Sequence, residues 1–233
     1  MKSRSLSNWA RAGSLIALCA GTAAPAQEVV NGASDAAASV SEVDAAVVSA
    51  TERLRSYLDN TTTLRAHFRG VVLDEDRTAL AQSEGELALK RPGRFRWEET
   101  APEAELLVTD GISLWNYTPD LEQVSVRDVA SLDRSTPAHL LGGGADLEKD
   151  FRVVGGYRVG ELDWVDVRPR ADSSDFSIVR FGFSSDGLRM MELHSKIGNI
   201  TQYVLDDVEE NGRIADSVFT FVPPPGTDVV DGS

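Results

Sequence analysis

Residues 90–117 read KRPGRFRWEETAPEAELLVTDGISLWNY, and they carry the clearest strand and turn signals of the chain. This stretch contains three runs of strand length, at residues 94–99, 106–109 and 112–117. Arg91-Pro92-Gly93 sets off the first run, and Asp110-Gly111 between the last two is a strong signal for a tight hairpin. Short strands joined by tight turns predict an antiparallel sheet.

Runs of the same kind continue on both sides of this stretch. They cover residues 64–72, 84–90, 178–183, 188–194 and 200–205. The polar residues 74–83 predict a loop, and Ser185-Asp186-Gly187 repeats the hairpin signal. The pattern predicts a mainly β protein with a few helices and about ten short antiparallel strands.

A helix is expected before the first strand. From Ser41 onward, apolar residues recur at helical spacing: Val43, Ala46, Val47, Ala50, Leu54, Tyr57 and Leu58. This stripe predicts an amphipathic helix of about five turns, with Ser41 as N-cap and Asp44 in the first turn. Residues 27–40 are small and polar without a stable period, which predicts a disordered lead-in.

A second, short helix is expected near residue 137. Ser135-Thr136-Pro137 supplies an N-cap and a first-turn proline, and Gly142-Gly143-Gly144 ends the helix. The proline-rich tail from Phe219 to Val230 excludes a central strand there. One curved sheet or incomplete antiparallel β-barrel, with helices against its concave face, fits this order. Two small domains are the weaker alternative, because no linker divides the strand region.

Residues 1–26 are typical of a secretory signal peptide. Lys2, Arg4 and Arg11 give a basic start, SLIALCA at residues 14–20 is a short apolar run, and Ala24-Pro25-Ala26 resembles a cleavage site. The run is shorter than the roughly twenty apolar residues of a membrane span. The only cysteine, Cys19, lies in this segment, so we expect an exported, disulfide-free domain at residues 41–233.

Composition narrows the classes of partner. The formal net charge is −14, and removal of the basic signal segment makes it more negative. Binding to nucleic acid needs clustered basic residues, so this acidity argues against it. It also argues against passive adsorption to anionic lipid heads.

No motif for catalysis stands out. His67, His139 and His194 do not have metal-ligand spacing, and known nucleophile and phosphate-loop motifs are missing. Asp163 and Asp166 around Trp164 are interpreted as solvated strand residues and not as an acid–base pair. The sequence predicts neither an enzyme nor a cofactor or metal site.

The aromatic residues leave two interpretations open. By the two-residue period of a strand, Phe95 and Trp97 share one face, as do Trp115 and Tyr117 on theirs. Such residues form an ordinary core or the wall of an apolar cavity. Periodicity alone does not separate the two.

The stretch resembles the family of outer-membrane lipoprotein carrier proteins, LolA. The similarity rests on KRPGRFRWE at 90–98, LVTDG at 107–111, LWNY at 114–117, DLEQV at 120–124 and the tail FTFVPPPGTDV at 219–229. The resemblance implies an incomplete barrel with a helical lid over an apolar cavity. It also implies a monomeric periplasmic carrier of acylated lipoproteins, loaded by an inner-membrane ABC transporter and unloaded onto an outer-membrane acceptor lipoprotein. The alternative is a lipid-binding sensor or structural domain of the same fold.

The resemblance also assigns roles to residues. Arg91, Thr136 and Pro137 fall on positions that gate the lid, where the arginine bonds to lid backbone. The positions expected to line the acyl-chain cavity are Phe95, Trp97, Leu107, Trp115, Leu140 and Leu141. Ala138 departs from the family pattern, because a bulky aromatic can stand there. With three glycines after Leu141, this predicts a more mobile lid.

Overall fold

The computed structural model describes residues 32–132, 134 and 136–231. The chain divides into two units, residues 1–38 and residues 39–233. The predicted signal peptide and its cleavage site lie outside the described residues. Within the described ranges, no helix has both the length and the apolar character needed to cross a membrane.

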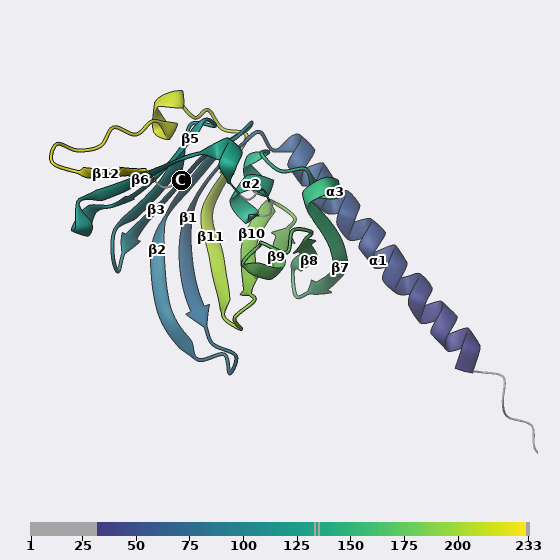
Figure 1. Cartoon of the computed structure of the whole chain (residues 1–233). Helices are drawn as coiled ribbons and strands as arrows, with labels where there is room; N and C mark the ends of the chain where they lie inside the picture. The colour runs from purple at the N-terminus through teal and green to yellow at the C-terminus, as the bar shows by residue number, and fades with distance from the viewer. Residues whose placement is uncertain (1–31, 133, 135, 232–233) are drawn as a thin grey trace, which may run out of the picture. The chain divides into compact units, whose positions relative to one another are not determined.

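One sheet organises the second unit. In the described part of the chain it has twelve strands, in the order β12-β6-β5-β4-β3-β2-β1-β11-β10-β9-β8-β7. The strands are β1 (Thr63–Leu73), β2 (Ala79–Lys90), β3 (Arg94–Ala101), β4 (Glu105–Thr109), β5 (Ser113–Thr118), β6 (Gln123–Asp128), β7 (Phe151–Val159), β8 (Leu162–Pro169), β9 (Phe176–Ser184), β10 (Gly187–Ser195), β11 (Ile200–Glu210) and β12 (Asp228–Asp231). All neighbours are antiparallel except β12, which is parallel to β6. The predicted mainly β fold with an open, curved sheet is confirmed (Figure 1).

Helices accompany this sheet. They are α1 (Gly32–Asn60), α2 (Pro137–Gly142) and α3 (Leu147–Asp150), with the short 3-10 helices η1 (Pro119–Leu121), η2 (Val129–Ser131) and η3 (Asp216–Phe219). The sheet curves around α2, which lies on its inner face (Figure 1). The links η1, η2 and α3 were not predicted, because helices this short carry too few residues to show a period.

The first helix starts earlier than predicted. It begins at Gly32, so residues 32–40, expected to be disordered, are helical. Ala36-Ala37-Ala38 explains the difference, because alanine favours helix even without an apolar stripe. The stripe itself is confirmed where Ala50, Leu54 and Tyr57 are buried.

Close contact between α1 and β7 depends on a glycine. A Cβ on Gly156 would lie 2.4 Å from the Cβ of Ala50 and 2.8 Å from the carbonyl oxygen of Ala46. Any larger residue at position 156 would therefore force α1 and β7 apart.

The expected loop at residues 74–83 is shorter than predicted, because β2 already begins at Ala79. The register explains this, since Val72 pairs with Ala81 and Val71 with Gln82. The apolar end of β1 thus pairs with a polar strand, which the sequence pattern alone does not identify.

The two faces of the sheet carry separate cores. On β1, Leu64, Ala66 and Phe68 are buried on the inner face, whereas Arg65 and His67 alternate with them and are exposed. The large inner core contains residues from α1, α2 and most strands. A small outer core consists of Ala88, Ile214 and Phe219 with Val218 packed against them, so the tail covers part of the outer face.

The outer face also holds charged residues, and the sequence pattern misplaced one of them. Asp166, expected to be solvated, is only 9% exposed. Its Oδ2 lies 3.3 Å from Nε of Arg180, whose Nη1 is 3.2 Å from Oε2 of Glu192. These partners come from the next two strands, β9 and β10, and only strand pairing brings them beside Asp166, so local sequence could not reveal them. Asp163 does pair at the surface, 3.4 Å from Arg158.

Candidate functional site

The inner face of the sheet forms an apolar interior beneath α2. Phe95 is 7% exposed and belongs to the inner core, and half-buried Trp97 and Leu107 pack against it. Trp97 pairs directly with Leu107 across β3 and β4, which places both side chains on one face. Of the predicted cavity residues, these three therefore lie together.

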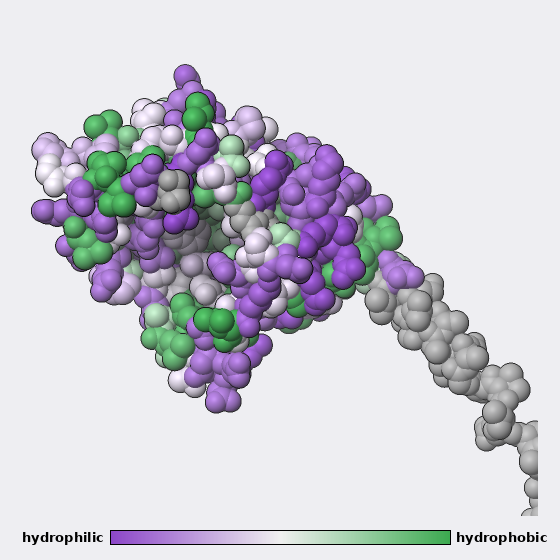
Figure 2. Space-filling model, in the orientation of Figure 1, coloured by the Kyte–Doolittle hydropathy of each residue, from purple (hydrophilic) through white to green (hydrophobic). Residues whose placement is uncertain are grey.

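An aromatic cluster that sequence reasoning missed completes this wall. The Phe68 ring stacks on Trp97 at a centroid distance of 3.8 Å, and Tyr203 meets Trp97 edge-on at 4.8 Å. Burial raises the pKa of Tyr203 to about 12, so its phenol stays neutral. Phe68 and Tyr203 come from β1 and β11, distant in sequence, and only the β1–β11 pairing brings them together. Figure 2 shows the molecule hollowed on this side, beside α2.

Trp115 was assigned to the wrong face. It pairs with Val108 on β4, and Thr109, the neighbour of Val108, pairs with Phe95. Because side chains alternate along a strand, Trp115 lies opposite the side that carries Phe95. Its companion Tyr117 meets Phe221 of the tail at 5.3 Å, on the outer face. Period-two alternation gives pairs that share a face but does not say which face is inside.

The helix α2 fills the upper part of the interior. Leu140 and Leu141 are 1% and 2% exposed and belong to the same core as Phe95. The predicted cap is confirmed: Thr136 is the N-cap, its Oγ1 accepts a hydrogen bond from the backbone N–H of His139 at 3.3 Å, and Pro137 opens the helix. The helix ends at Gly142, and its C-cap Gly143 has a φ of 78°, which favours glycine. Leu140 and Leu141, expected to face the cavity, thus pack within the inner core in this structure.

Arg91 fastens the C-terminal end of α2. Its Nε donates a 2.7 Å hydrogen bond to the carbonyl oxygen of Leu141. Next to it, the backbone N–H of Gly93 donates at 2.7 Å to the carbonyl oxygen of Gly142. A Cβ on Gly143 would lie 3.3 Å from Cδ of Arg91, so the arginine stem lies along the helix end. We call these two hydrogen bonds the latch.

The Arg91 guanidinium of the latch is a charged group in a largely buried position. Burial lowers the pKa of Arg91, opposed by the nearby Tyr57 and Asp59, and the guanidinium remains charged at neutral pH. Among the described residues, its Nη2 is buried without a hydrogen-bond partner. A buried donor left unsatisfied costs free energy, so this attachment of α2 is less stable than a fully paired one would be.

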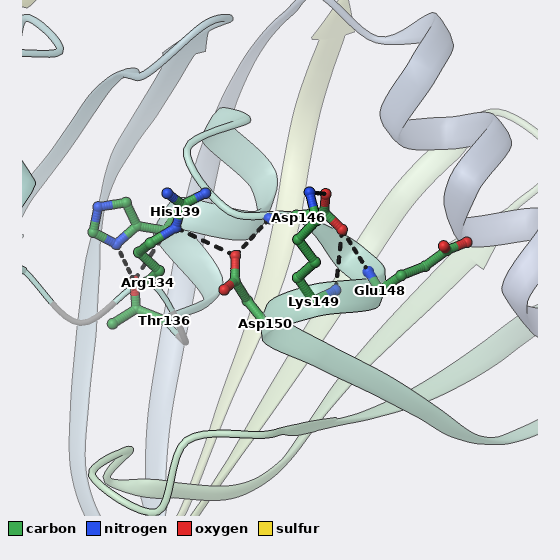
Figure 3. A network of polar contacts seen from close by, with 7 residues as sticks. All are labelled: Arg134, Thr136, His139, Asp146, Glu148, Lys149 and Asp150. Carbon is green, nitrogen blue, oxygen red and sulfur yellow. Dashed lines mark hydrogen bonds and ion pairs between the residues drawn. The ribbon is translucent and has the colours of Figure 1, made fainter.

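Asp150 connects the chain segments on either side of α2. Its Oδ2 accepts a 2.7 Å hydrogen bond from the backbone N–H of Asp146 and lies 3.3 Å from Nε of Arg134 (Figure 3). One carboxylate thus joins the segment before α2 to the segment after it. Sequence reasoning missed this residue, although Asp146 before a four-residue helix is a recognisable N-cap.

Groups for other chemistry are scarce near this interior. Among the described residues, no cluster of three or more His, Cys, Asp or Glu side chains is arranged to hold a metal ion. The interior offers an apolar surface, and the charged Arg91 beside it bonds to the end of α2.

Comparison with known proteins identifies relatives of this chain. Residues 59–222 match the family model "Outer membrane lipoprotein carrier protein LolA". A protein from Methylobacillus flagellatus named "Outer-membrane lipoprotein carrier protein" is 40% identical over 179 residues, which cover 77% of this chain and 87% of that protein. One of the same name from Dechloromonas aromatica is 40% identical over 181 residues, covering 78% and 87%. A crystal structure of an uncharacterised conserved protein from Thermus thermophilus shares the fold, with a TM-score of 0.50 at 13% identity, covering 78% of this chain and 98% of that one.

Proposed function

The chain belongs to the family of outer-membrane lipoprotein carrier proteins, LolA, and from this premise we propose that it carries acylated lipoproteins through the periplasm. Their acyl chains occupy the inner face of the sheet, between Trp97, Leu107 and α2. The lid opens to admit them and closes when the protein is empty.

The latch is the observation that supports this mechanism most directly. An ordinary core needs no charged side chain to fasten one short helix over it. Here the apolar leucines of α2 are held by hydrogen bonds from Arg91 and Gly93 to carbonyl oxygens at one helix end. Release of these few bonds frees the helix and exposes the inner wall.

Energetics explain why the site must be apolar but need not bind tightly. Burial of an acyl chain contributes about 0.8 kcal/mol per methylene. A bilayer offers the same gain, so a carrier has only to match it approximately. A lid that costs free energy to open lowers the apparent affinity for cargo, because the binding-competent state is only partly populated. Onward transfer then becomes possible.

The partners follow from the same proposal. Lipoproteins arrive from an inner-membrane ABC transporter and leave to an outer-membrane acceptor lipoprotein, and the carrier works as a monomer. The proposed domain spans residues 41–233, after removal of the signal peptide.

Purification from the periplasm tests the function. Mass spectrometry of the co-purified material should identify triacylated lipoproteins, and a Trp97→Asp variant should lose them. Tyr117→Asp, on the outer face, is the matched control and should retain them. Recovery of the same lipoproteins with both variants, or of none with the wild type, would contradict the proposal.

A further inference from the structure

Three arginines border a pocket outside the inner core. The pocket, of about 240 Å³, is lined by Arg152, Arg168, Pro169 and Arg170. We call it the arginine pocket. It lies where β7 begins and β8 ends, and its three arginines are exposed.

Two of these arginines oppose each other across the sheet. Arg152 on β7 pairs directly with Arg168 on β8. Like charges in this position repel and destabilise the sheet. In the described part of the chain, neither side chain forms an ion pair or hydrogen bond within the protein. The fold therefore carries an uncompensated concentration of positive charge on an otherwise acidic molecule.

The third arginine is held in place. Nε of Arg170 donates hydrogen bonds to the carbonyl oxygens of Glu148 at 3.0 Å and Phe151 at 2.8 Å. Both bonds use the same nitrogen, so the two terminal nitrogens of the guanidinium remain available to a ligand. A fixed guanidinium loses little entropy on binding an oxyanion.

Nearby carboxylates do not neutralise the pocket, because they are engaged elsewhere. Glu148 forms an ion pair with Arg55 of α1. Asp150 bonds to Arg134 and to the backbone of Asp146. Both acids flank Lys149 in α3, and both serve contacts other than the arginine pocket.

We propose that the arginine pocket binds the phosphate of an anionic phospholipid headgroup and so docks the carrier on a membrane surface. Guanidinium groups match phosphate oxygens with paired donors. The choice of a headgroup as the source of phosphate rests on the proposed carrier function, since such a protein must approach membranes. The assignment of an anion site depends only on the arginines and not on the carrier function.

The position of the pocket gives this docking a purpose. Arg170 is bonded to Glu148 within α3 and to Phe151, the residue that caps its end, and α3 follows α2 along the chain. A headgroup in the pocket brings the connection between lid and sheet close to the membrane. The acidic remainder of the protein is repelled, so contact is short-lived and oriented by this one patch.

Vesicle partition of the full mature protein tests the proposal. Vesicles of phosphatidylcholine alone are compared with vesicles of phosphatidylcholine and phosphatidylglycerol. Each arginine near an anionic surface contributes about fivefold to partition. The Arg152→Gln/Arg168→Gln variant should therefore bind the anionic vesicles about 25-fold less well, with no change on neutral vesicles.

A matched variant separates the pocket from net charge. Arg77→Gln/Arg213→Gln removes two exposed arginines from loops elsewhere and should partition like the wild type. Equal loss in both double variants, or none in the pocket variant, would overturn the proposal. So would binding of inorganic phosphate in calorimetry with no preference of the protein for anionic vesicles.

Two further readouts keep the result interpretable. The pocket variant should unfold at the same temperature as the wild type or higher, because a cross-strand repulsion is removed. Uptake of a fluorescent acyl probe in the absence of vesicles should be unchanged in the pocket variant. Failure of that uptake in the wild type would count against the carrier function, whereas failure of vesicle binding alone counts against the pocket.

Discussion

The turn at residues 90–94 fastens a different cover on each face of the sheet, and the two fastenings differ in kind. On the inner face, Arg91 reaches a backbone carbonyl of α2 from a desolvated position. On the outer face, Lys90 and Arg94 both lie 2.6 Å from Oδ1 of Asp216, an exposed carboxylate at the start of η3. The same short turn thus holds a lid and a tail.

The two covers also differ in how firmly they are held. The tail places Phe219, which is 0% exposed, into the outer core, and its ion pairs only guide it there. The lid has two buried leucines, but its latch leaves a buried donor of Arg91 unpaired. We infer that the tail is a permanent part of the fold and that α2 separates from the sheet while the rest stays folded.

The largest effect is expected from truncating one residue of each cover. Phe219→Ala should lower the free energy of unfolding by about 3–5 kcal/mol, as for a fully buried phenylalanine. Leu141→Ala should cost less than Phe219→Ala, because the loss is capped by the free energy of lid opening. Urea denaturation measures both. Equal losses would mean that α2 unfolds only with the whole protein.

The second prediction concerns the latch. Arg91→Leu should leave the protein folded but speed amide hydrogen exchange in residues 138–144 by about 10- to 100-fold, the equivalent of a charged hydrogen bond worth 1.5–3 kcal/mol. Lipoprotein should then be accepted but passed on poorly, because the open state is stabilised. Arg94→Leu is the control, since it removes an arginine of the same turn from the outer face. Matching exchange and transfer rates for Arg91→Leu and wild type would rule out gating.

These contrasts show what the sequence could and could not predict. The strands around residue 95, the cap at Thr136 and the position of Arg91 beside the lid followed from local turn signals and from the family resemblance. The face of Trp115 did not, because alternation fixes relative and not absolute orientation. The partners of Asp166 and the role of Asp150 depend on strands and segments that meet only in the folded chain.

The start of α1 and the length of β2 failed for a related reason. Alanine propensity extended the helix where no apolar stripe marked it, and pairing with β1 extended a strand that is polar by itself. Tertiary contacts determine the secondary structure of such segments, whereas periodicity detects only residues that face a core.

A third, smaller effect tests how loosely the lid is held. Ala138 is half-buried against the inner core. Ala138→Phe adds an aromatic ring there, which should stabilise closure by about 1 kcal/mol, slow exchange in residues 138–144 and reduce uptake of a fluorescent apolar probe. Ala130→Phe in η2 serves as the control and should change neither. Unchanged exchange and uptake in Ala138→Phe would indicate that α2 is not the moving part.

The smallest effect is expected at the exposed fastening of the tail, and it should appear as a pH dependence. Hydrogen bonding from Lys90, together with the charge of Arg94, holds the pKa of Asp216 below its usual value. A carboxyl group whose pKa is lower in the folded state stabilises the protein above its unfolded pKa of about 4. This contribution disappears as the pH falls through the folded pKa, where both states are protonated. Asp216→Asn should therefore unfold slightly more easily at neutral pH and lose part of the stability change seen on acidification below about pH 4. Thermal unfolding of the variant and wild type across this range measures the difference. An identical pH profile would show that Phe219 alone keeps the tail in place, and that only the lid depends on a charged side chain from this turn.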